Sequence, residues 1–474
     1  MALPGKAARH MINRFSYGYT AGLQRAVANA GGPEQWFESQ LRPSKVADTK
    51  ANAMKAWYPY LRSSAKVRRA ADHAGKRPSW EQSMDLVRWT ILRRITSKRQ
   101  LHETMVDFWS NLLHVPAFDD GWMFRVSYDS MIRKYALTTF SDLLVHATLH
   151  PSLGLFLNSV NSTKDDTNEN HGRELLELHT VGLGAGYTEA MVKDSARILT
   201  GYHIEPWQST KRTYRPGDHY VGPVNVLGFH DANADPDGRA VAKRYLRYLA
   251  KHPATAKRIA TRLAQRFVSD NPSSDLVAAA AHAYTTSGTS IKATLRAIIH
   301  HPDFAASVDG LVRTPSQDAV ATYRALGVVP RKPRKGDYFG VAVPYVLGDM
   351  GESPFGWPAP NGFPEVSAAW ASVGRMRSSW DMHFFTAGGY WPSKGVSRLK
   401  PHLYLPAGAV RLDEAVDYLS RRLLGRPGTE ACVTAATQLT ELKASDVVKR
   451  ATFGDWRAVQ LITTVLNSPE HLRK

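Results

Sequence analysis

Apolar residues recur at three- and four-residue steps through most of the chain, and this spacing predicts amphipathic helices. The run after Pro78 shows the pattern clearly, because Ser79-Trp-Glu-Gln82 has the form of a capping box at a helix start. The apolar stripe that follows consists of Trp80, Met84, Val87, Ile91 and Ile95. We expect this stripe to be buried.

The next segment, Leu101 to His114, has one apolar and one polar face and stops before Pro116. Its apolar face is formed by Met105, Val106, Trp109 and Leu113. At helical spacing its polar face holds Glu103, Asp107, Ser110 and His114 within a sector of about 60°. This polar stripe is either an amphipathic surface facing water or one wall of a site.

Helical periodicity is lost between 201 and 237, where Pro and Gly alternate with short β-like runs. We therefore predict a mainly α protein, a multi-helix bundle with a small β-hairpin excursion near 201–237. Its predicted segments are an N-terminal helical region (1–200), the irregular excursion (201–240), a second helical region packed on the first (241–330), a Pro/Gly-rich connection (331–364) and C-terminal helices (365–474).

The densest group of ionisable residues lies in Asn168-Glu-Asn-His-Gly-Arg-Glu-Leu-Leu-Glu-Leu-His-Thr-Val-Gly182. As a helix, this central segment places Asn170, Arg173, Glu174 and Glu177 on one narrow face, whereas Leu175 and His179 point the other way. Charged side chains rarely leave water without partners, so the charged face is either solvated or the wall of a site.

The central segment also carries a family resemblance. Asn168-Glu-Asn-x-x-Arg-Glu-Leu-x-Glu-Leu-His, Gly-Tyr-Thr at 186–188 and Ala196-Arg-Ile-Leu-Thr-Gly201 together resemble the bacterial family called domain of unknown function 1800. Further matching runs are Arg9-His-Met-Ile-Asn-Arg-Phe-Ser-Tyr-Gly18, His252-Pro-x-Thr-Ala256, Arg266-Phe-Val-Ser-Asp270 and Gly356-Trp-Pro-Ala-Pro-Asn-Gly-Phe-Pro364. The resemblance implies a helical fold but no agreed activity. Many members of that family look exported.

The two polar stripes together suggest a metal-assisted or acid–base site. We expect Glu174 and Glu177 to be largely buried, within reach of Arg173 and of at least one group from the Glu103–His114 stripe. Carboxylates and a neutral imidazole suit divalent iron, manganese or zinc, with the hypothetical ligands Glu103, Asp107, His114, Glu174 and Glu177. Two features argue against a bound metal. The usual Glu-x-x-His pairing is missing, and an Arg173–Glu177 pair would neutralise one ligand.

In a catalytic reading, Glu174 and Glu177 are ligands or the base, His114 is a ligand or proton carrier, and Arg173 is an electrostatic clamp. A second group of candidates lies in the irregular excursion and consists of His203, His219, His230 and Asp231. The cationic ridge Arg258, Arg262 and Arg266 either holds an anionic substrate or pairs with the acidic helices.

Charge and composition narrow the classes of function. The formal net charge is +19, with basic runs such as Arg331-Lys-Pro-Arg-Lys335, which indicates either an anionic polymer as partner or a solvated basic surface. The single cysteine, Cys432, excludes an internal disulfide and is expected to be a buried apolar residue. No Gly-rich phosphate loop, Gly-x-Ser-x-Gly elbow or His-Glu-x-x-His motif is present.

Two functions remain open. The chain is either an enzyme acting on a polar or anionic substrate through a buried Glu/Asp/His cluster, or a non-catalytic basic helical scaffold that binds a partner protein or an anionic polymer. The sequence has no signal peptide and no uninterrupted apolar stretch of membrane-spanning length, so a cytoplasmic protein without a transmembrane segment is expected.

Overall fold

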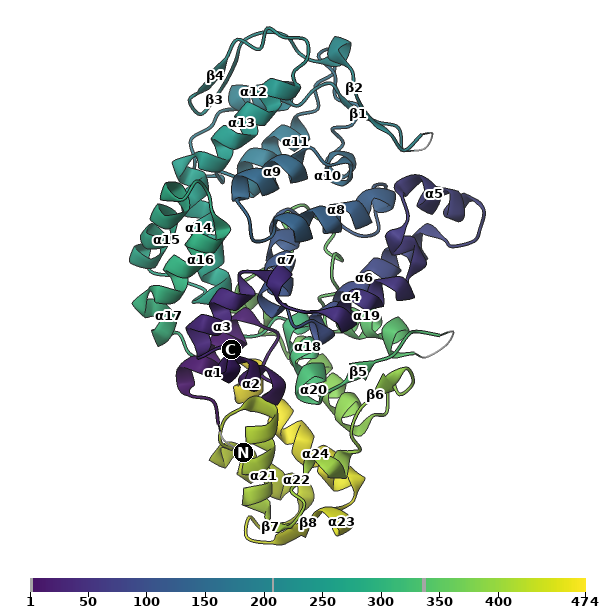
Figure 1. Cartoon of the computed structure of the whole chain (residues 1–474), viewed down its shortest axis with the longest axis vertical. Coiled ribbons are helices and arrows are strands. Elements are labelled where there is room, and N and C mark those ends of the chain that lie inside the picture. Colours follow the sequence, from purple (N-terminus) through teal and green to yellow (C-terminus); the bar gives the residue numbers. More distant parts are fainter. Residues whose placement is uncertain (1–2, 207–208, 335–337) are drawn as a thin grey trace.

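A computed structural model describes residues 3–206, 209–334 and 338–474. It is 60% helical and contains small antiparallel sheets of two strands each (Figure 1). The predicted mainly α fold is therefore confirmed. Lys335, the last residue of one predicted basic run, lies outside the described residues.

The helices before residue 200 are α1 (Lys6–Phe15), α2 (Ala21–Asn29), α3 (Pro33–Gln40), α4 (Thr49–Ala53), α5 (Ala65–His73), α6 (Ser79–Thr96), α7 (Gln100–Leu112), α8 (Trp122–Tyr135), α9 (Phe140–Thr148), α10 (Pro151–Phe156), α11 (Glu169–Glu174) and α12 (Glu189–Ile198). A π-helical turn, Leu175–His179, continues α11. Single 3-10 turns lie at Pro43–Lys45, Met54–Trp57, Pro59–Arg62, Pro216–Asp218, Ser367–Trp370 and Pro401–Tyr404.

The later helices are α13 (Arg239–Lys251), α14 (Pro253–Phe267), α15 (Ser274–Thr286), α16 (Ile291–His300), α17 (Pro302–Ala306), α18 (Pro315–Ala325), α19 (Phe339–Asp349), α20 (Val373–Gly388), α21 (Leu412–Leu424), α22 (Glu430–Thr440), α23 (Arg450–Phe453), α24 (Asp455–Leu466) and α25 (Pro469–Leu472). The strands are β1 (Tyr202–Ile204), β2 (Arg212–Tyr214), β3 (Val224–Val226), β4 (Phe229–Asp231), β5 (Val329–Pro330), β6 (Val396–Ser397), β7 (Ala409–Arg411) and β8 (Val447–Lys449).

The predicted β excursion contains two antiparallel hairpins. β1 pairs with β2, with Tyr202 opposite Tyr214, and β3 pairs with β4, with Val226 opposite Phe229. Both hairpins lie at one end of the long axis, and β3 and β4 pack beside α12 and α13 (Figure 1). The excursion therefore forms a small cap on the helical body.

Local capping explains several of the helix starts. The side chain of Thr188 accepts a hydrogen bond from the amide of Met191 at the start of α12, and His252 caps α14 through the amide of Ala254. The predicted capping box at Ser79 is wrong. The Ser79 amide instead donates to the carboxylate of Asp72 (2.6 Å), so the acceptor comes from the preceding helix and not from a hydroxyl within the motif.

The apolar stripe of α6 is buried in its later members. Trp80 is 52% exposed, in contrast to the prediction, and Met84 is half-buried, whereas Val87 and Ile91 are fully buried. Trp80 lies in the first turn of the helix. The remaining stripe packs in the interior, and Cys432 is buried as expected.

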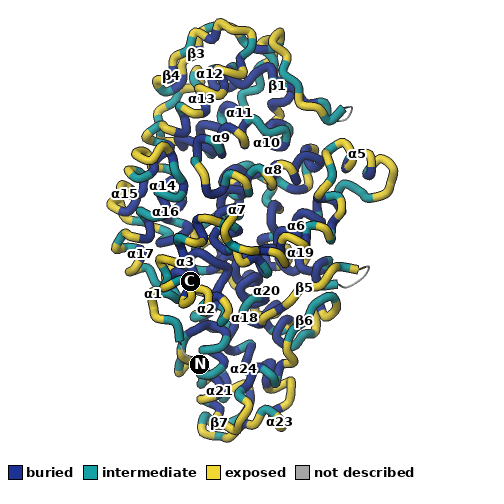
Figure 2. Tube along the Cα trace, in the orientation of Figure 1, coloured by how far each residue is buried: buried dark blue, intermediate teal, exposed yellow. Residues whose placement is uncertain are grey.

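Two large apolar cores fill the molecule, and Figure 2 shows their buried backbone as dark blue along the whole long axis. The first joins α7 to α9 and to α13–α16, and the second joins α6 to α18–α22 and α24. Helices α6 and α7 follow each other directly in sequence yet belong to different cores. Polar and charged side chains between these two helices therefore lie near a boundary between cores.

Helix α11 packs closely on α12, and Gly172 marks the point of closest approach. A Cβ atom added at Gly172 would lie 2.6 Å from the Ala196 amide nitrogen, which is shorter than any real contact. Gly172→Ala is therefore expected to lower the free energy of unfolding by about 1–3 kcal/mol in urea denaturation. Gly184→Ala is the matched control, because a Cβ there meets nothing within 4 Å. If the two variants were equally stable, the close packing of α11 on α12 at Gly172 would be contradicted.

Candidate functional site: a charged cavity between the two cores

The charged face of the central segment is half-buried, and not largely buried as predicted. Arg173 binds Glu189 (Nη1–Oε1 2.9 Å) and lies 3.8 Å from Glu177, and all of these side chains are partly or largely exposed. Glu174 is also half-exposed, although burial and then the nearby Glu177 raise the pKa of its carboxyl. Solvent and Arg173 together balance these carboxylates, so they need no partner from α7.

The opposite face of the central segment points inward, as its apolar residues predict. Leu175 and His179 are fully buried, on the π-helical turn that follows α11. Among the described residues neither ring nitrogen of His179 has a hydrogen-bond partner, and burial lowers the pKa of His179 to about 3. The inner face of this segment is therefore neutral, and the charges lie outside.

Of the carboxylates of α7, Glu103 is buried and Asp107 is half-buried, and each is held by arginines. Glu103 binds Arg93 (2.8 Å) on α6 and Arg133 (2.7 Å) on α8. Asp107 binds Arg94 on α6 with one oxygen and Arg266 on α14 with the other. Burial alone would raise the pKa of Asp107, but the two guanidinium groups outweigh it and hold that pKa below its usual value.

The predicted convergence of Glu174 and Glu177 with the Glu103–His114 stripe is not what the structure shows. Arginines from α6, α8 and α14 neutralise Glu103 and Asp107, and both oxygens of Asp107 are occupied. Within residues 3–206, 209–334 and 338–474, the five proposed metal ligands do not form a cluster in which three ligand atoms lie within 4.8 Å of one another. A metal at Asp107 would have to displace a guanidinium group.

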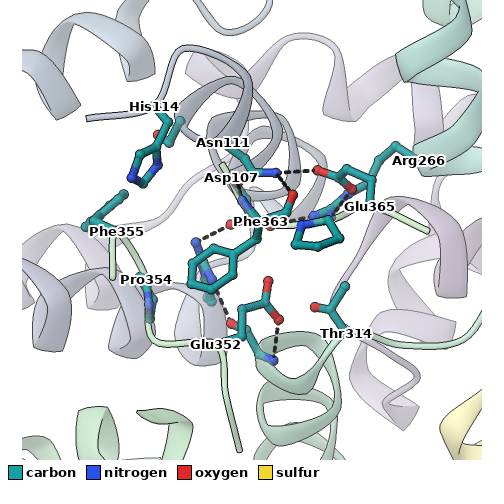
Figure 3. A pocket seen from close by; sticks show the side chains of 14 residues that line it. Asp107, Asn111, His114, Arg266, Thr314, Glu352, Pro354, Phe355, Phe363 and Glu365 are labelled. Carbon is teal, nitrogen blue, oxygen red and sulfur yellow. Dashed lines mark hydrogen bonds and ion pairs between the residues drawn. The ribbon is translucent and has the colours of Figure 1, made fainter. Parts of the chain in front are cut away.

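Asp107 and His114 instead line a polar cavity between the two cores (Figure 3). Arg94, Asp107, Arg266 and Ser316 come from four helices, α6, α7, α14 and α18, and the segment 352–365 after α19 covers the remaining side. The free space holds roughly one or two water molecules. The site as it stands therefore accepts water or one small polar group.

The charges around the cavity are paired. Arg266 binds Asp107 and also Glu365 (Nη1–Oε2 2.9 Å), and Glu365 accepts a hydrogen bond from Asn111 (3.0 Å). Arg94 donates to the hydroxyl of Ser316 (2.8 Å). Two arginines therefore face two ionised carboxylates, and an added anion would find no unpaired cation among these groups.

Glu352 differs from the other carboxylates of the cavity because none of the described arginines forms an ion pair with it. Its side chain accepts from the backbone amide of Ser316 (2.8 Å), and the residue is 9% exposed. Burial raises the pKa of Glu352 to about 7, and the negative charge of Asp107 contributes in the same direction. This carboxyl is consequently poised between its protonated and ionised forms near neutral pH.

The covering segment is held against α7 and His114. Asn111 and Phe363 exchange two hydrogen bonds (2.9 and 2.7 Å), and His114 Nε2 lies 2.8 Å from the Trp357 carbonyl oxygen. Gly362 has a φ of 67°, and a Cβ there would lie 2.3 Å from the Asn111 carbonyl oxygen. Burial lowers the pKa of His114 to about 4, so His114 is a neutral donor to this segment.

The histidines of the excursion do not meet in one site. His203 lies 2.8 Å from Asp218, His219 contacts Asn233 (3.0 Å), and His230 is exposed. Asp231 binds Arg244 on α13. His203, His219 and Asp231 therefore have separate partners that stabilise the excursion locally, and His230 faces solvent.

Sequence patterns missed Glu352 and Glu365, because neither belongs to a periodic stripe. Glu352 lies in the Pro/Gly-rich segment and Glu365 directly after it, and the only available signal was an acidic residue among Pro, Gly and aromatic neighbours. The arginine ridge was expected either to hold an anionic substrate or to pair with the acidic helices. Arg266 supports the second alternative, because it pairs with the acidic side chains of Asp107 and Glu365.

Fold and cavity together define a mainly helical protein with an enclosed, charge-lined site between two cores. Residues 10–473 match the family described as Protein of unknown function (DUF1800), and the chain belongs to that family. The resemblance inferred from the motifs is thus confirmed over nearly the whole chain. No curated protein and no solved structure matches the chain. In the part of the chain that the structure describes, no helix is long and apolar enough to cross a membrane.

Proposed function

We propose that this protein is an enzyme in which Glu352 transfers a proton to or from a small polar substrate group in the central cavity. One observation supports this proposal above all others: a buried carboxyl with a pKa of about 7 faces a polar cavity. Proton transfer is most effective when the pKa of the catalytic group lies near the working pH. The protonated carboxyl would serve as the acid and the ionised one as the base.

The surrounding residues have supporting roles in this proposal. Arg94 and Arg266 keep Asp107 ionised, and that negative charge helps to hold the Glu352 proton at neutral pH. Ser110 offers its hydroxyl to a substrate hydroxyl or carbonyl. Because the cationic groups are already paired, an uncharged polar substrate group fits better than a strong anion.

Infrared titration tests the proposal without knowledge of the substrate. The wild-type minus Glu352→Gln difference spectrum is expected to contain a protonated-carboxyl band at pH 6 that disappears as the pH rises through about 7. A carboxyl that is fully ionised at pH 6 would remove the basis of the proposal.

An activity screen then separates the structural site from the sequence-predicted one. Small chromogenic esters, amides, glycosides and phosphate esters are offered to the wild type, Glu352→Gln and Glu177→Gln. The proposal expects a loss of about 100-fold or more for Glu352→Gln only. The catalytic roles predicted for Glu174, Glu177, Arg173 and His114 stay predictions, and loss of activity in Glu177→Gln alone would favour them.

A second candidate function, binding of an anionic polymer, rests on α13. Arg239, Lys243, Arg247 and Lys251 recur every four residues and are all exposed, so their charges form a ridge with a spacing of about 6 Å. Polymers with regularly spaced phosphates or carboxylates suit such a ridge.

Binding of this kind has a clear salt signature. Affinity for heparin or single-stranded nucleic acid is expected to fall steeply between 50 and 200 mM salt, by roughly 10-fold or more. The triple variant Lys243→Glu, Arg247→Glu, Lys251→Glu should lose most of this affinity. Reversal of the scattered exposed residues Lys6, Lys50 and Lys449 changes net charge equally and is the control. Equal losses would indicate that only net charge matters.

A further inference from the structure

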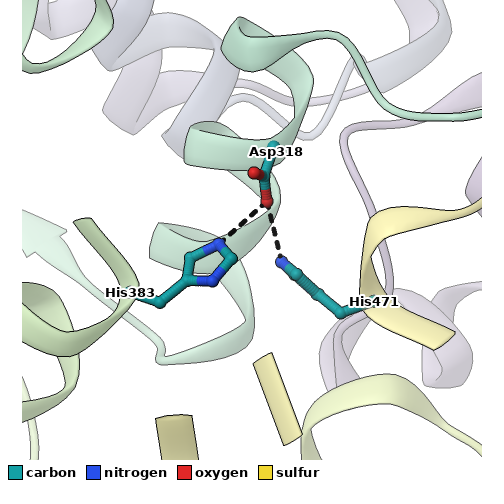
Figure 4. Close-up of side chains that lie close together, drawn as sticks. All are labelled: Asp318, His383 and His471. Carbon is teal, nitrogen blue, oxygen red and sulfur yellow. Dashed lines mark hydrogen bonds and ion pairs between the residues drawn. The ribbon is translucent and has the colours of Figure 1, made fainter. Parts of the chain in front are cut away.

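Three side chains that no sequence pattern connects meet in the second core. Asp318 on α18, His383 on α20 and His471 on α25 point toward one another (Figure 4). Asp318 and His383 are fully buried, and His471 is 3% exposed. Across the described residues, this is the one group of at least three His, Cys, Asp or Glu side chains whose ligand atoms all lie within 4.8 Å of one another.

The distances match those between ligands of one metal ion. Oδ1 of Asp318 lies 2.9 Å from Nε2 of His383 and 3.2 Å from Nε2 of His471. Two ligands about 2.1 Å from a tetrahedral ion are separated by about 3.4 Å. A small shift of the side chains would therefore place all three atoms around one ion.

The surroundings of His383 orient it as a ligand. Its Nδ1 lies 2.8 Å from the side-chain oxygen of Asn467, and its Nε2 faces Asp318. A neutral imidazole has one N–H group, so donation to Asn467 leaves the Nε2 lone pair facing a carboxylate oxygen. Donation from the second nitrogen to an amide oxygen is also how metal-bound histidines are usually held.

Thr322 contacts His471, and Arg375 contacts Asp318. Thr322 lies one turn after Asp318, and its hydroxyl is 2.9 Å from Nε2 of His471, within reach of a fourth position. The other oxygen of Asp318 accepts from Arg375 (3.2 Å), which leaves Oδ1 to the two histidines. Because Arg375 already balances the carboxylate, the ion must be held chiefly by the imidazoles.

We propose that Asp318, His383 and His471 bind one divalent first-row transition ion, such as zinc or ferrous iron. Two imidazoles and one carboxylate suit these ions, whereas calcium and magnesium prefer sites made of oxygen ligands. The ion would hold α18, α20 and α25 together, although the three ligand residues are up to 153 positions apart in the sequence. The proposal is independent of acid–base chemistry at Glu352.

Metal analysis of the full-length protein tests this site. The chain is incubated or refolded with Zn²⁺ or Fe²⁺, freed of loose ions by gel filtration, and analysed by mass spectrometry. We expect about one equivalent per chain for the wild type, and at least a 10-fold lower content for His383→Ala and His471→Ala. His402→Ala is the matched control, because His402 also pairs with an aspartate (Asp455, 2.6 Å) but lies at the surface.

A measurement on the wild type alone covers the case in which the variants fail to fold. Co²⁺ in place of the native ion should produce the visible absorption of a tetrahedral nitrogen and oxygen site. A wild type that retains less than about a tenth of an equivalent after refolding would overturn the proposal. The proposal would equally fail if a folded His383→Ala, His471→Ala double variant kept its metal, since the ion would then lie elsewhere.

Discussion

Glu103→Ala is expected to lower the free energy of unfolding by about 3–5 kcal/mol. Glu103 is 1% exposed and binds Arg93 and Arg133, which reach it from α6 and α8. Without the Glu103 carboxylate, the guanidinium groups of Arg93 and Arg133 have fewer partners. Because they were removed from water on folding, no hydration replaces the lost contacts. Urea denaturation followed by circular dichroism measures the difference.

Glu189→Ala is the control for this prediction, since it also removes a carboxylate paired with an arginine. Glu189 binds Arg173 at the surface, where water replaces the lost partner. No resolvable change in stability is expected for that variant. If both glutamates proved equally dispensable, the buried ion pairs of α7 would not contribute as described.

Glu352→Gln should stabilise the protein by about 3 kcal/mol at pH 8, with little effect near pH 4. The folded-state pKa of about 7 exceeds the ordinary value of 4.5 by about 2.5 units, and each unit corresponds to about 1.4 kcal/mol. Between these two pH values, the folded protein holds a proton that the unfolded chain has released. Wild-type stability therefore falls as pH rises through this window and stays lower above it.

Glutamine removes this titration but still accepts from the Ser316 amide, so the variant should lack the decline between about pH 4.5 and 7. Glu430→Gln, at an exposed position, should follow the wild-type curve. Parallel pH curves for the wild type and Glu352→Gln would show that the buried carboxyl does not titrate as expected.

Local chemistry determined much of the fold. The apolar spacing predicted a mainly α chain, and capping by Thr188 and His252 set helix starts that the structure contains. The loss of periodicity after residue 200 correctly located the two hairpins. These features depend on residues within a few positions of one another, so the sequence displays them directly. The division into five segments stays a prediction.

The candidate site depended on contacts that sequence spacing does not contain. A stripe of carboxylates looks the same whether water, a metal or arginines balance it. For Glu103 and Asp107 the balancing groups are arginines on α6, α8 and α14, up to 159 residues away. For Glu177 they are Arg173 and solvent.

The sequence by itself determined the helices, the two hairpins, the inward face of the central segment and the family. Only the tertiary structure decided which charged groups share an interior. It placed Glu352 beside Asp107 and brought Asp318 to His383 and His471. The physical reason is that burial and ion pairing depend on which faces of distant helices pack together. The pKa of a carboxyl is set by that packing and not by its neighbours in the chain.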